Sequence, residues 1–400
     1  MGCGACSYVC PEKKIRLIDF KEDGIRPVIT SNNCSDCDVC IKVCPGYETI
    51  HKSFSNTSEM IPQLKEGWGP ILEVWEGYAA DPGLRYNGSS GGLASAIALY
   101  CLEKGGAHGV LHTAASHYEP WKNKTVLSQN RQDILSRTGS RYLPASPCDG
   151  LSQIESAPET CVFIGKPCDV AGLRKAQALK KELDEKVEVA IGIFCAGTPA
   201  TQGTLELFKN LDINLNEIED IRYRGKGWPG MFTVTLKGKD SLTRSLSYKE
   251  SWSFLQKYRP YRCYLCPDGT SEFADISCGD PWYRQIKEDD SGYSLVLVRT
   301  EKGRKILQGA IDTGYVILEK VNPKILVDSQ INLLSKRSTI WGRLFAMKSF
   351  GIPTPQLRGF SLFKNWWSLP VYEKIRSLFG TTRRIIQRKY YKQRGFTSHQ

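Results

Sequence analysis

The sequence contains no long apolar run and no N-terminal signal peptide. No stretch approaches the roughly 20 apolar residues that a membrane-spanning helix needs, so a transmembrane protein is not expected. The 15 cysteines are an odd number, which does not favour the disulfide framework of a secreted protein. The 400 residues are 41% hydrophobic and suffice for two or three domains. These features predict a soluble cytoplasmic protein with reduced thiols.

Some signatures of nucleotide binding and base reading are also missing. The glycine- and serine-rich segment from Asn87 to Gly92 is neither a Walker loop nor a G-x-G-x-x-G fingerprint, and the chain has no low-complexity segment. No base-reading motif accompanies its positive charge, so nucleic acid is not an expected partner.

Acidic residues are scarce near the C-terminus. Between residues 364 and 394 there are nine Lys or Arg and one acid, Glu373, together with aromatic residues that include Trp366, Trp367, Phe379, Tyr390 and Tyr391. Such a tail is typical of peripheral contact with an anionic membrane or an acidic partner, and equally of a solvated basic helix.

Cysteine, by contrast, is abundant at the N-terminus. Cys34, Cys37, Cys40 and Cys44 form a C-x2-C-x2-C-x3-C run that Pro45 follows, and the triplet Cys3, Cys6 and Cys10, followed by Pro11, repeats its last three members. This is the ligand spacing of a two-cluster [4Fe–4S] ferredoxin. Zinc and disulfides are alternatives, but the tandem runs with proline after each last cysteine favour iron–sulfur clusters. The motif therefore predicts one-electron transfer.

In such tandem runs, the fourth cysteine of each run binds the other cluster. One cluster is then complete, with Cys34, Cys37, Cys40 and Cys10 as ligands. The other has Cys3, Cys6 and Cys44, and its fourth ligand would lie just before Met1. A misassigned start, a three-iron cluster and a non-cysteine ligand are the open explanations.

A second, dispersed set of cysteines follows. Cys168 and Cys195 each come at the end of an apolar segment that reads as a strand, and Cys263-x2-Cys266 precedes Pro267. Neighbouring parallel strands bring their ends together, so these four thiolates can form a third site. Cys278 is a substitute candidate and Cys101 fits the core. A C-x2-C pair also occurs in zinc and redox sites, which leaves the metal open.

The secondary-structure pattern predicts an α+β protein with an α/β portion. Residues 1–55 form a ferredoxin-like module with a hairpin turning at Asp23–Gly24. Strands alternating with helices over 56–220 indicate an α/β layer. Residues 221–350 form a more mixed part, and residues 351–400 are the basic, aromatic tail.

Two turns are candidate phosphate or cofactor sites. The first, Asn87, Gly88, Ser89, Ser90, Gly91 and Gly92, leads into a predicted helix at 93–104, whose N-terminus and hydroxyls suit an anion. The alternative is a simple helix cap. The second turn contains Gly139, Ser140, Arg141 and Tyr142, and is either a dinucleotide contact or an ordinary loop. Lys166 ends a predicted strand, where ligands of open α/β sheets gather, although it is otherwise a surface charge.

The order of these motifs resembles the coenzyme F420 hydrogenase/dehydrogenase beta-subunit family. The resemblance covers about residues 1–350 and rests on the two turns, on 163–168, on Cys263–Cys266, and on the segments 275–280 and 293–303. It implies a mixed α/β flavin-binding body with FAD and two or three [4Fe–4S] clusters. The incomplete first run and the basic tail depart from the family pattern.

The family resemblance also implies a function. Members pass electrons between a deazaflavin or similar hydride partner and one-electron carriers, so the expected partners are a small-molecule hydride carrier and a ferredoxin-like protein. A non-catalytic electron-transfer subunit is the alternative. Relatives include chlorophyll-side-chain reductases, and some members are linked to polysaccharide synthesis, so the resemblance does not fix a substrate.

Overall fold

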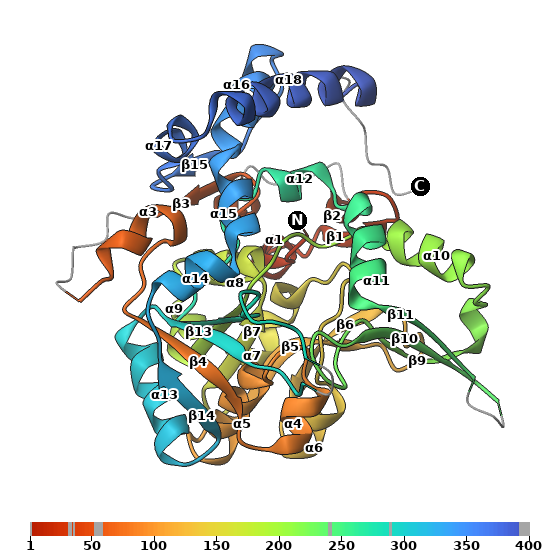
Figure 1. Ribbon diagram of the computed structural model, residues 1–400, viewed down its shortest axis with the longest axis vertical. Coiled ribbons are helices and arrows are strands. Elements are labelled where there is room, and N and C mark those ends of the chain that lie inside the picture. The colour runs from red at the N-terminus through yellow and green to blue at the C-terminus, as the bar shows by residue number, and fades with distance from the viewer. Residues whose placement is uncertain are drawn as a thin grey trace.

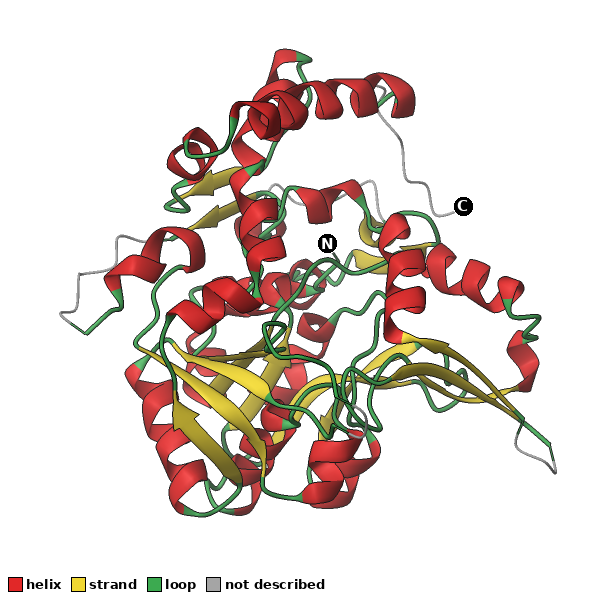
Figure 2. Ribbon diagram, in the orientation of Figure 1, coloured by secondary structure: helices red, strands yellow, loops and turns green. Residues whose placement is uncertain are grey.

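An eight-stranded mixed sheet forms the centre of the molecule (Figures 1 and 2). The computed structural model describes residues 2–30, 34, 37–51, 59–238, 242–287 and 290–391. The strands, in spatial order, are β14 Val316–Lys320, β4 Glu73–Ala79, β13 Ser294–Val298, β12 Ile276–Gly279, β8 Val187–Ile193, β7 Cys161–Gly165, β5 Gly109–Ala115 and β6 Asn123–Ser128. The four in the middle, β12, β8, β7 and β5, are mutually parallel, and the outer ones pair antiparallel.

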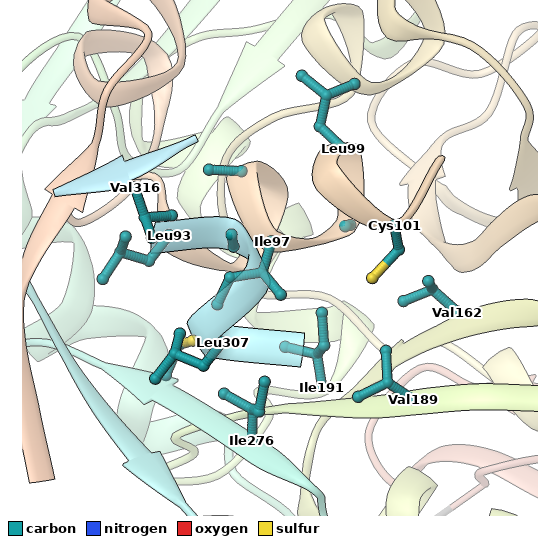
Figure 3. Packing of buried hydrophobic residues seen from close by; sticks show 14 of the residues in the cluster. Leu93, Ile97, Leu99, Cys101, Val162, Val189, Ile191, Ile276, Leu307 and Val316 are labelled. Carbon is teal, nitrogen blue, oxygen red and sulfur yellow. The ribbon is translucent and has the colours of Figure 1, made fainter. Parts of the chain in front are cut away.

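Helices cover both faces of this sheet. On one face, α5 (Leu93–Glu103) and α13 (Glu301–Asp312) pack on the alternate strand residues that point their way; Figure 3 shows Ile97 and Leu307 beside Ile191 and Ile276. The small helices α4 (Pro82–Asn87) and α6 (Arg131–Ser136) lie near α5. Because successive strand residues point to opposite faces, the other half of the strand side chains remains for the second face.

Three helices and the N-terminal module cover one part of the second face. Helices α7 (Leu151–Glu155), α8 (Pro167–Gln177) and α9 (Lys181–Lys186) share a buried cluster with Leu111, Phe163 and Ala190 of the strands. Ala5, Tyr8 and Val9 of helix α1 (Ala5–Val9) belong to the same cluster. The N-terminal module is therefore packed into the body through a continuous hydrophobic core.

The N-terminal module has the predicted hairpin. Strands β1 (Ile15–Phe20) and β2 (Gly24–Ile29) pair antiparallel with Phe20 opposite Gly24, which confirms the turn at Asp23–Gly24. Helix α2 (Val39–Lys42) and strand β3 (Glu48–Ile50) complete the described part. Residues 31–33, 35–36 and 52–58 lie outside the described residues.

A smaller antiparallel sheet stands beside the main one. Its strands, in the order β11-β10-β9, are β9 Ile218–Arg222, β10 Met231–Leu236 and β11 Thr243–Ser247. Helices α10 (Thr201–Asn210) and α11 (Tyr248–Leu255) flank it, α12 (Tyr261–Tyr264) follows them in the chain, and short 3-10 helices lie at Pro62–Leu64, Pro147–Gly150, Leu215–Glu217 and Gln256–Tyr258. The mixed character predicted after residue 221 is thus present, and the α+β fold class with an α/β portion is confirmed.

The C-terminal part is mostly helical. Its first helices pack on the main sheet, because Leu326 and Leu333 share a buried cluster with Val74 and Leu295, and its last helices lie at the top of Figure 1. It contains α14 Lys324–Ser329, α15 Ile331–Ser338, α16 Ile340–Ser349, α17 Leu362–Trp367 and α18 Val371–Arg388, while α3 (Lys65–Trp68) contacts α15. Strand β15 (Gln356–Arg358) pairs parallel with β3, so the start of the predicted tail is joined to the end of the N-terminal module. The domain boundaries at 55, 220 and 350 remain predictions. Among the described residues, no helix combines the length and apolar composition needed to cross a bilayer.

Candidate functional site

The carboxyl ends of three parallel strands meet at one edge of the main sheet. Lys166 comes directly after β7, Cys195 follows β8 and Asp280 follows β12. Ligands of open α/β sheets bind outside such strand ends, because the loops diverge there and leave a crevice. Two adjoining cavities lie at this edge.

The larger cavity has a volume of about 340 Å³, within the range of cofactor sites. Nine of the predicted cofactor residues line it: Gly88, Ser89, Ser90, Gly92, Gly139, Ser140, Arg141, Tyr142 and Lys166. Asn87 and Gly91 are not in the lining. The Asn87 amide donates to the Gly83 carbonyl, and the Gly91 N–H donates to Ser294 Oγ, so both serve the turn itself.

The glycine-rich turn delivers the start of α5 to this cavity. Gly92 is the N-cap with φ 74°, and a Cβ there would stand 2.6 Å from the Leu84 carbonyl oxygen, so only glycine fits. Leu93, Ala94 and Ser95 of the first turn also line the cavity. The unpaired N–H groups and the dipole of a helix N-terminus favour an anion such as a phosphate.

The two predicted turns, about fifty residues apart in sequence, contact each other. The backbone N–H of Ser140 donates to Ser89 Oγ, which joins them into one wall of the cavity. Arg141 is partly occupied by the fold, since its guanidinium donates to Asn123 Oδ1 and to the carbonyls of Pro120 and Lys122. The Arg141 guanidinium is therefore largely used within the fold. The groups that remain to bind a ligand on this wall are mainly hydroxyls and backbone N–H donors.

Sequence reasoning missed the opposite wall of this cavity. There Arg224 holds Asp280 through two hydrogen bonds of 2.8 and 2.7 Å, and Trp228 Nε1 donates to the same carboxylate at 2.9 Å. Tyr248 and Trp282 stack with ring centroids 5.4 Å apart, and the Arg224 guanidinium lies 4.7 Å above the Tyr248 ring. These residues come from three separate segments, the loop after β9, the start of α11 and the loop after β12, so no local pattern indicates them. Only Asp280 fell within a motif of the family resemblance.

Lys166 lies in the wall that the two cavities share. Its Nζ contacts both carboxylate oxygens of Asp169, at 2.8 and 2.7 Å, and the Ala145 carbonyl at 3.3 Å. Burial opposes its charge, but the Asp169 carboxylate and the Cys168 sulfur beside it more than offset this and raise the pKa of Lys166. The ammonium is therefore a fixed positive charge between the cavities.

The smaller cavity brings together the four dispersed cysteines. It has a volume of about 50 Å³, and its lining includes Cys168, Cys195, Cys263 and Cys266. Cys168 belongs to the first turn of α8, and Cys263 to α12. Cys278 instead lies in β12 and faces the larger cavity, so the structure does not place the substitute candidate in this set. Metal binding by the four remains a prediction.

The chemistry of this donor set fits an iron–sulfur cluster. Burial raises the pKa of Cys168 and Cys195, and that of Cys266 to about 11, so the thiols lose their protons only when a metal supplies positive charge. Within the described ranges, no three His, Cys, Asp or Glu side chains converge on a point that would hold one metal ion. A four-iron cluster places its thiolates on four different irons and does not require such convergence.

The division of the N-terminal cysteines into two cluster sets remains a prediction. Burial raises the pKa of Cys6 to about 12, with further contributions from Cys3, Cys44 and Cys40, and burial also raises the pKa of Cys40, with contributions from Cys34 and Cys37. Lys14 lies near both Cys34 and Cys10. Cys148, which belongs to neither predicted set, is buried with its thiol against Cys3, and its Sγ donates to the Asp169 carbonyl at 3.2 Å.

The N-terminal module borders the four-cysteine cavity directly. The hairpin residues Asp23 to Arg26 form part of its lining, and Cys3 is close enough to Cys168 to contribute to its raised pKa. Arg262 spans the boundary, because its Nη2 donates to the carbonyls of Pro45 and Gly46, at 3.2 and 3.1 Å, immediately after Cys44. Its Nη1 is buried and has no hydrogen-bond partner among the described residues.

Comparisons with known proteins agree with this picture. Residues 1–46 match the 4Fe-4S dicluster domain, residues 74–152 the N-terminal model of the coenzyme F420 hydrogenase/dehydrogenase beta subunit, and residues 159–324 its C-terminal model. The first match places the chain in the class of iron–sulfur redox proteins. The other two together cover more than half of the chain, which therefore belongs to the coenzyme F420 hydrogenase/dehydrogenase beta-subunit family.

Several similar proteins are named as F420-dependent oxidoreductases or as subunits of them. The coenzyme F420-dependent sulfite reductase of Methanocaldococcus jannaschii is 26% identical over 70% of this chain, although the match covers only 46% of that protein. The coenzyme F420 hydrogenase subunit beta of Methanothermobacter thermautotrophicus is 24% identical over 72% of this chain and 99% of its own length. A chain of the F420-reducing [NiFe] hydrogenase complex from Methanosarcina barkeri shares the fold, with a TM-score of 0.57 and 24% identity over 72% of this chain and 97% of its own.

Proposed function

We propose that this protein is an iron–sulfur flavoprotein oxidoreductase. In this proposal FAD occupies the larger cavity, the four dispersed cysteines hold a [4Fe–4S] cluster, and the N-terminal module holds two more. The observation that carries the proposal is the shared wall between the cavities, formed by Ala145, Lys166, Cys195, Gly197 and Thr198. Because the smaller cavity also borders the N-terminal module, the three redox sites form one continuous series.

Each part of the larger cavity has a role in this proposal. The Gly88–Ser95 segment offers backbone N–H groups and hydroxyls to the phosphates. The stacked pair of Tyr248 and Trp282 offers a flat apolar surface to a ring system, and the bound flavin supplies the conversion between two-electron and one-electron transfer. Lys166 holds a positive charge where negative charge develops during reduction of a ring system.

The partners follow from the two ends of the series. A deazaflavin such as coenzyme F420, or another hydride carrier, is the proposed two-electron partner at the larger cavity. A ferredoxin-like protein is the proposed one-electron partner at the N-terminal module, where Cys34 and Cys37 are exposed. We place the protein in the cytoplasm, with a peripheral membrane contact through its basic tail. A role in polysaccharide synthesis is proposed from the resemblance alone.

Cofactor analysis followed by reduction tests this proposal. Anaerobically purified protein should contain flavin together with about twelve irons per chain, because three four-iron clusters hold four each. Reduced F420 should bleach the flavin absorbance within one turnover, and the clusters should be reduced afterwards. Iron and sulfide without flavin would rule the proposal out.

A non-catalytic electron-transfer subunit is the second candidate. The similar hydrogenase and formate dehydrogenase chains are named as beta subunits, which favours it. Under this candidate the isolated protein carries clusters and flavin but oxidises no hydride donor until a partner subunit is added. The same single-turnover experiment, with the isolated chain, separates the two.

A further inference from the structure

The helices at the C-terminus turn an apolar face away from the protein. On α18, Tyr372, Ile375, Phe379 and Ile386 are exposed at helical spacing, with Tyr372 and Phe379 at 70% and 69%. The face that packs inward carries Ser377, Thr381 and Ile385. A helix at the surface of a folded protein normally buries its apolar face and exposes its polar face. The exposed apolar face of α18 therefore indicates contact with an apolar environment outside the chain.

Aromatic residues extend this face onto α17. Phe363 and Trp367 lie 5.7 Å apart between ring centroids and are 50% and 64% exposed. Lys374 of α18 lies 4.8 Å above the Trp367 ring, which joins the two helices. We call the six exposed residues Phe363, Trp367, Tyr372, Ile375, Phe379 and Ile386 the C-terminal ridge. In Figure 1 the two helices form the outermost layer of the molecule.

Positive charge flanks the ridge. Arg376 and Arg383 are exposed on the neighbouring side of α18, and Lys389 stands just after its end. Over the described residues 362–391 there are seven Lys or Arg and one acid, Glu373. Arg384 is excluded from this surface, because it packs over the Tyr261 and Tyr264 rings. Two copies of such a surface would repel each other, whereas a surface with fixed negative charge would attract it.

A cavity beside the ridge has the same character. It measures about 710 Å³ and is lined by Trp341, Phe345 and Phe363 together with the cations Lys348 and Arg358. Trp341 contacts Phe363 at 5.1 Å between ring centroids, so the aromatic surface runs from the cavity onto the ridge. An apolar cavity lined also by cations suits a lipid, whose acyl chain would contact the aromatic rings and whose anionic headgroup would contact the cations. All of these residues follow the segments that match the family models, which end at residue 324.

We propose that the C-terminal ridge binds the surface of a bilayer that contains anionic phospholipid. Exposed tryptophan, tyrosine and phenylalanine beside arginine and lysine match the headgroup level of a membrane, where apolar rings and cations are both stabilised. The ridge is spread over two helices and its side chains are at least half exposed or nearly so, which fits a lipid surface better than the groove of a protein partner. This inference gives the lipid chemistry of the proposed membrane contact and is independent of the redox chemistry.

Vesicle binding tests the inference with the full-length, cofactor-loaded protein. It should sediment with phosphatidylcholine vesicles that contain phosphatidylglycerol, and binding to pure phosphatidylcholine should be at least tenfold weaker. Added salt should weaken binding to the anionic vesicles, because the arginines act through screened charge. Binding to neither vesicle, or equal binding to both, would overturn the inference.

Two pairs of substitutions locate the contact. Trp367→Ala with Phe379→Ser removes apolar area, and Arg376→Gln with Arg383→Gln removes charge; each should weaken vesicle binding about tenfold or more. The matched controls are Tyr118→Ala with Ile286→Ser, and Lys124→Gln with Lys209→Gln, which change exposed residues of the same types elsewhere. Equal loss in the controls would overturn the inference.

Two further measurements distinguish membrane binding from loss of the cofactors and from binding to another protein. Iron and flavin contents of every variant should equal those of the parent, since these side chains lie outside both cavities, so a failed redox proposal and a failed membrane proposal give different results. A dimer that dissociates on Trp367→Ala with Phe379→Ser, without vesicle binding, would mean that the ridge binds a second copy and would overturn the lipid assignment. So would binding to an acidic protein without vesicle binding.

Discussion

The two sets of cysteines in this chain are built in opposite ways. The N-terminal set consists of local runs in which two or three residues separate one cysteine from the next. Two of its members, Cys34 and Cys37, are exposed. The body set, Cys168, Cys195, Cys263 and Cys266, comes from three separate segments and lines a small cavity. The first set is suited to exchange electrons with a partner at the surface, and the second to pass them on inside the protein.

The cavity walls give the reason for this division. The body set adjoins the larger cavity through Lys166 and Cys195 and adjoins the N-terminal module through the hairpin at Asp23–Arg26. It is the one set of cysteines in the described part of the chain that touches both neighbours. We therefore expect that loss of the body cluster stops electron transfer between the larger cavity and the N-terminal module. Loss of a cluster in the N-terminal module should prevent only the transfer of electrons to an outside partner.

The largest effect is expected from removing a ligand of the body set. Cys263→Ser should lower the iron content from about twelve to about eight per chain, because one four-iron cluster is lost. Flavin reduction by a hydride donor should persist while the N-terminal clusters stay oxidised. Iron analysis and electron paramagnetic resonance measure both, and Cys101→Ser, a buried cysteine of the core, is the control. An unchanged iron content in Cys263→Ser would remove the third cluster from the account.

Removing a ligand of the N-terminal set should have a different result. Cys40→Ser should also lose about four irons, since its cluster has no spare thiolate. The body cluster should still accept electrons from the flavin, which a single-turnover absorbance trace follows. If Cys40→Ser also blocked reduction of the body cluster, the two sets would not be arranged in series.

A smaller effect is expected at the boundary between the sets. Arg262→Gln removes a cation that lines the four-cysteine cavity and donates to the carbonyls of Pro45 and Gly46, just after Cys44. A nearby positive charge favours the reduced, more negative cluster, so the potential of the body cluster should fall by about 60 mV, equivalent to tenfold for one electron. Redox titration with paramagnetic resonance detection measures this shift.

The control for Arg262 is another arginine bonded to the same short helix. Arg343 donates to the Tyr264 carbonyl at 2.6 Å and does not line the cavity. Arg343→Gln should leave the cluster potential unchanged. A shift of equal size in both variants would assign the effect to disturbance of α12.

The smallest effect concerns the pH dependence of stability in the larger cavity. Burial, followed by the charge of Arg137, lowers the pKa of His112 to about 4 from its ordinary 6.5. The unfolded chain therefore binds a proton between pH 6.5 and 4 that the folded chain refuses, and stability falls as the pH falls through this range. Between pH 7 and 5 the loss should be about 2 kcal/mol.

Denaturant unfolding at the two pH values measures this loss. His112→Gln should remove most of the pH dependence, because glutamine does not titrate. His117→Gln, at an exposed position, should leave it unchanged. A pH dependence that survives in His112→Gln would assign it to other groups.

Spacing and periodicity predicted what is local in this molecule. The tandem cysteine runs, the Asp23–Gly24 hairpin and the Gly88–Gly92 turn into α5 each depend on residues close together in the chain, and the structure contains the hairpin and the turn as expected. The prediction that Cys168 and Cys195 lie near Cys263 and Cys266 needed one assumption about long-range structure, namely that the ends of two strands lie at the same edge of the sheet. The structure bears out this assumption, since β7 and β8 are adjacent and parallel.

What the sequence could not reveal depends on long-range packing. The Arg224–Asp280 pair joins the loop after β9 to the end of β12, and Arg262 meets Pro45 across more than two hundred residues. The pairing of β15 with β3 joins the predicted tail to the N-terminal module. Each of these strands has only three residues, which is too short for an alternating pattern that would predict a strand from the sequence. Asn87 and Gly91 were expected to face a ligand, but which residues of a tight turn point outward depends on its exact dihedral angles.

The central claim is that electrons pass from the larger cavity through the four-cysteine set to the N-terminal module. The most direct test mixes the anaerobic protein with reduced F420 and follows flavin and cluster absorbance, with freeze-quenched paramagnetic resonance samples, over a single turnover. The account predicts flavin reduction first, then the body cluster, then the N-terminal clusters, with the sequence stopping at the flavin in Cys263→Ser. Reduction of the N-terminal clusters at an undiminished rate in Cys263→Ser would contradict it.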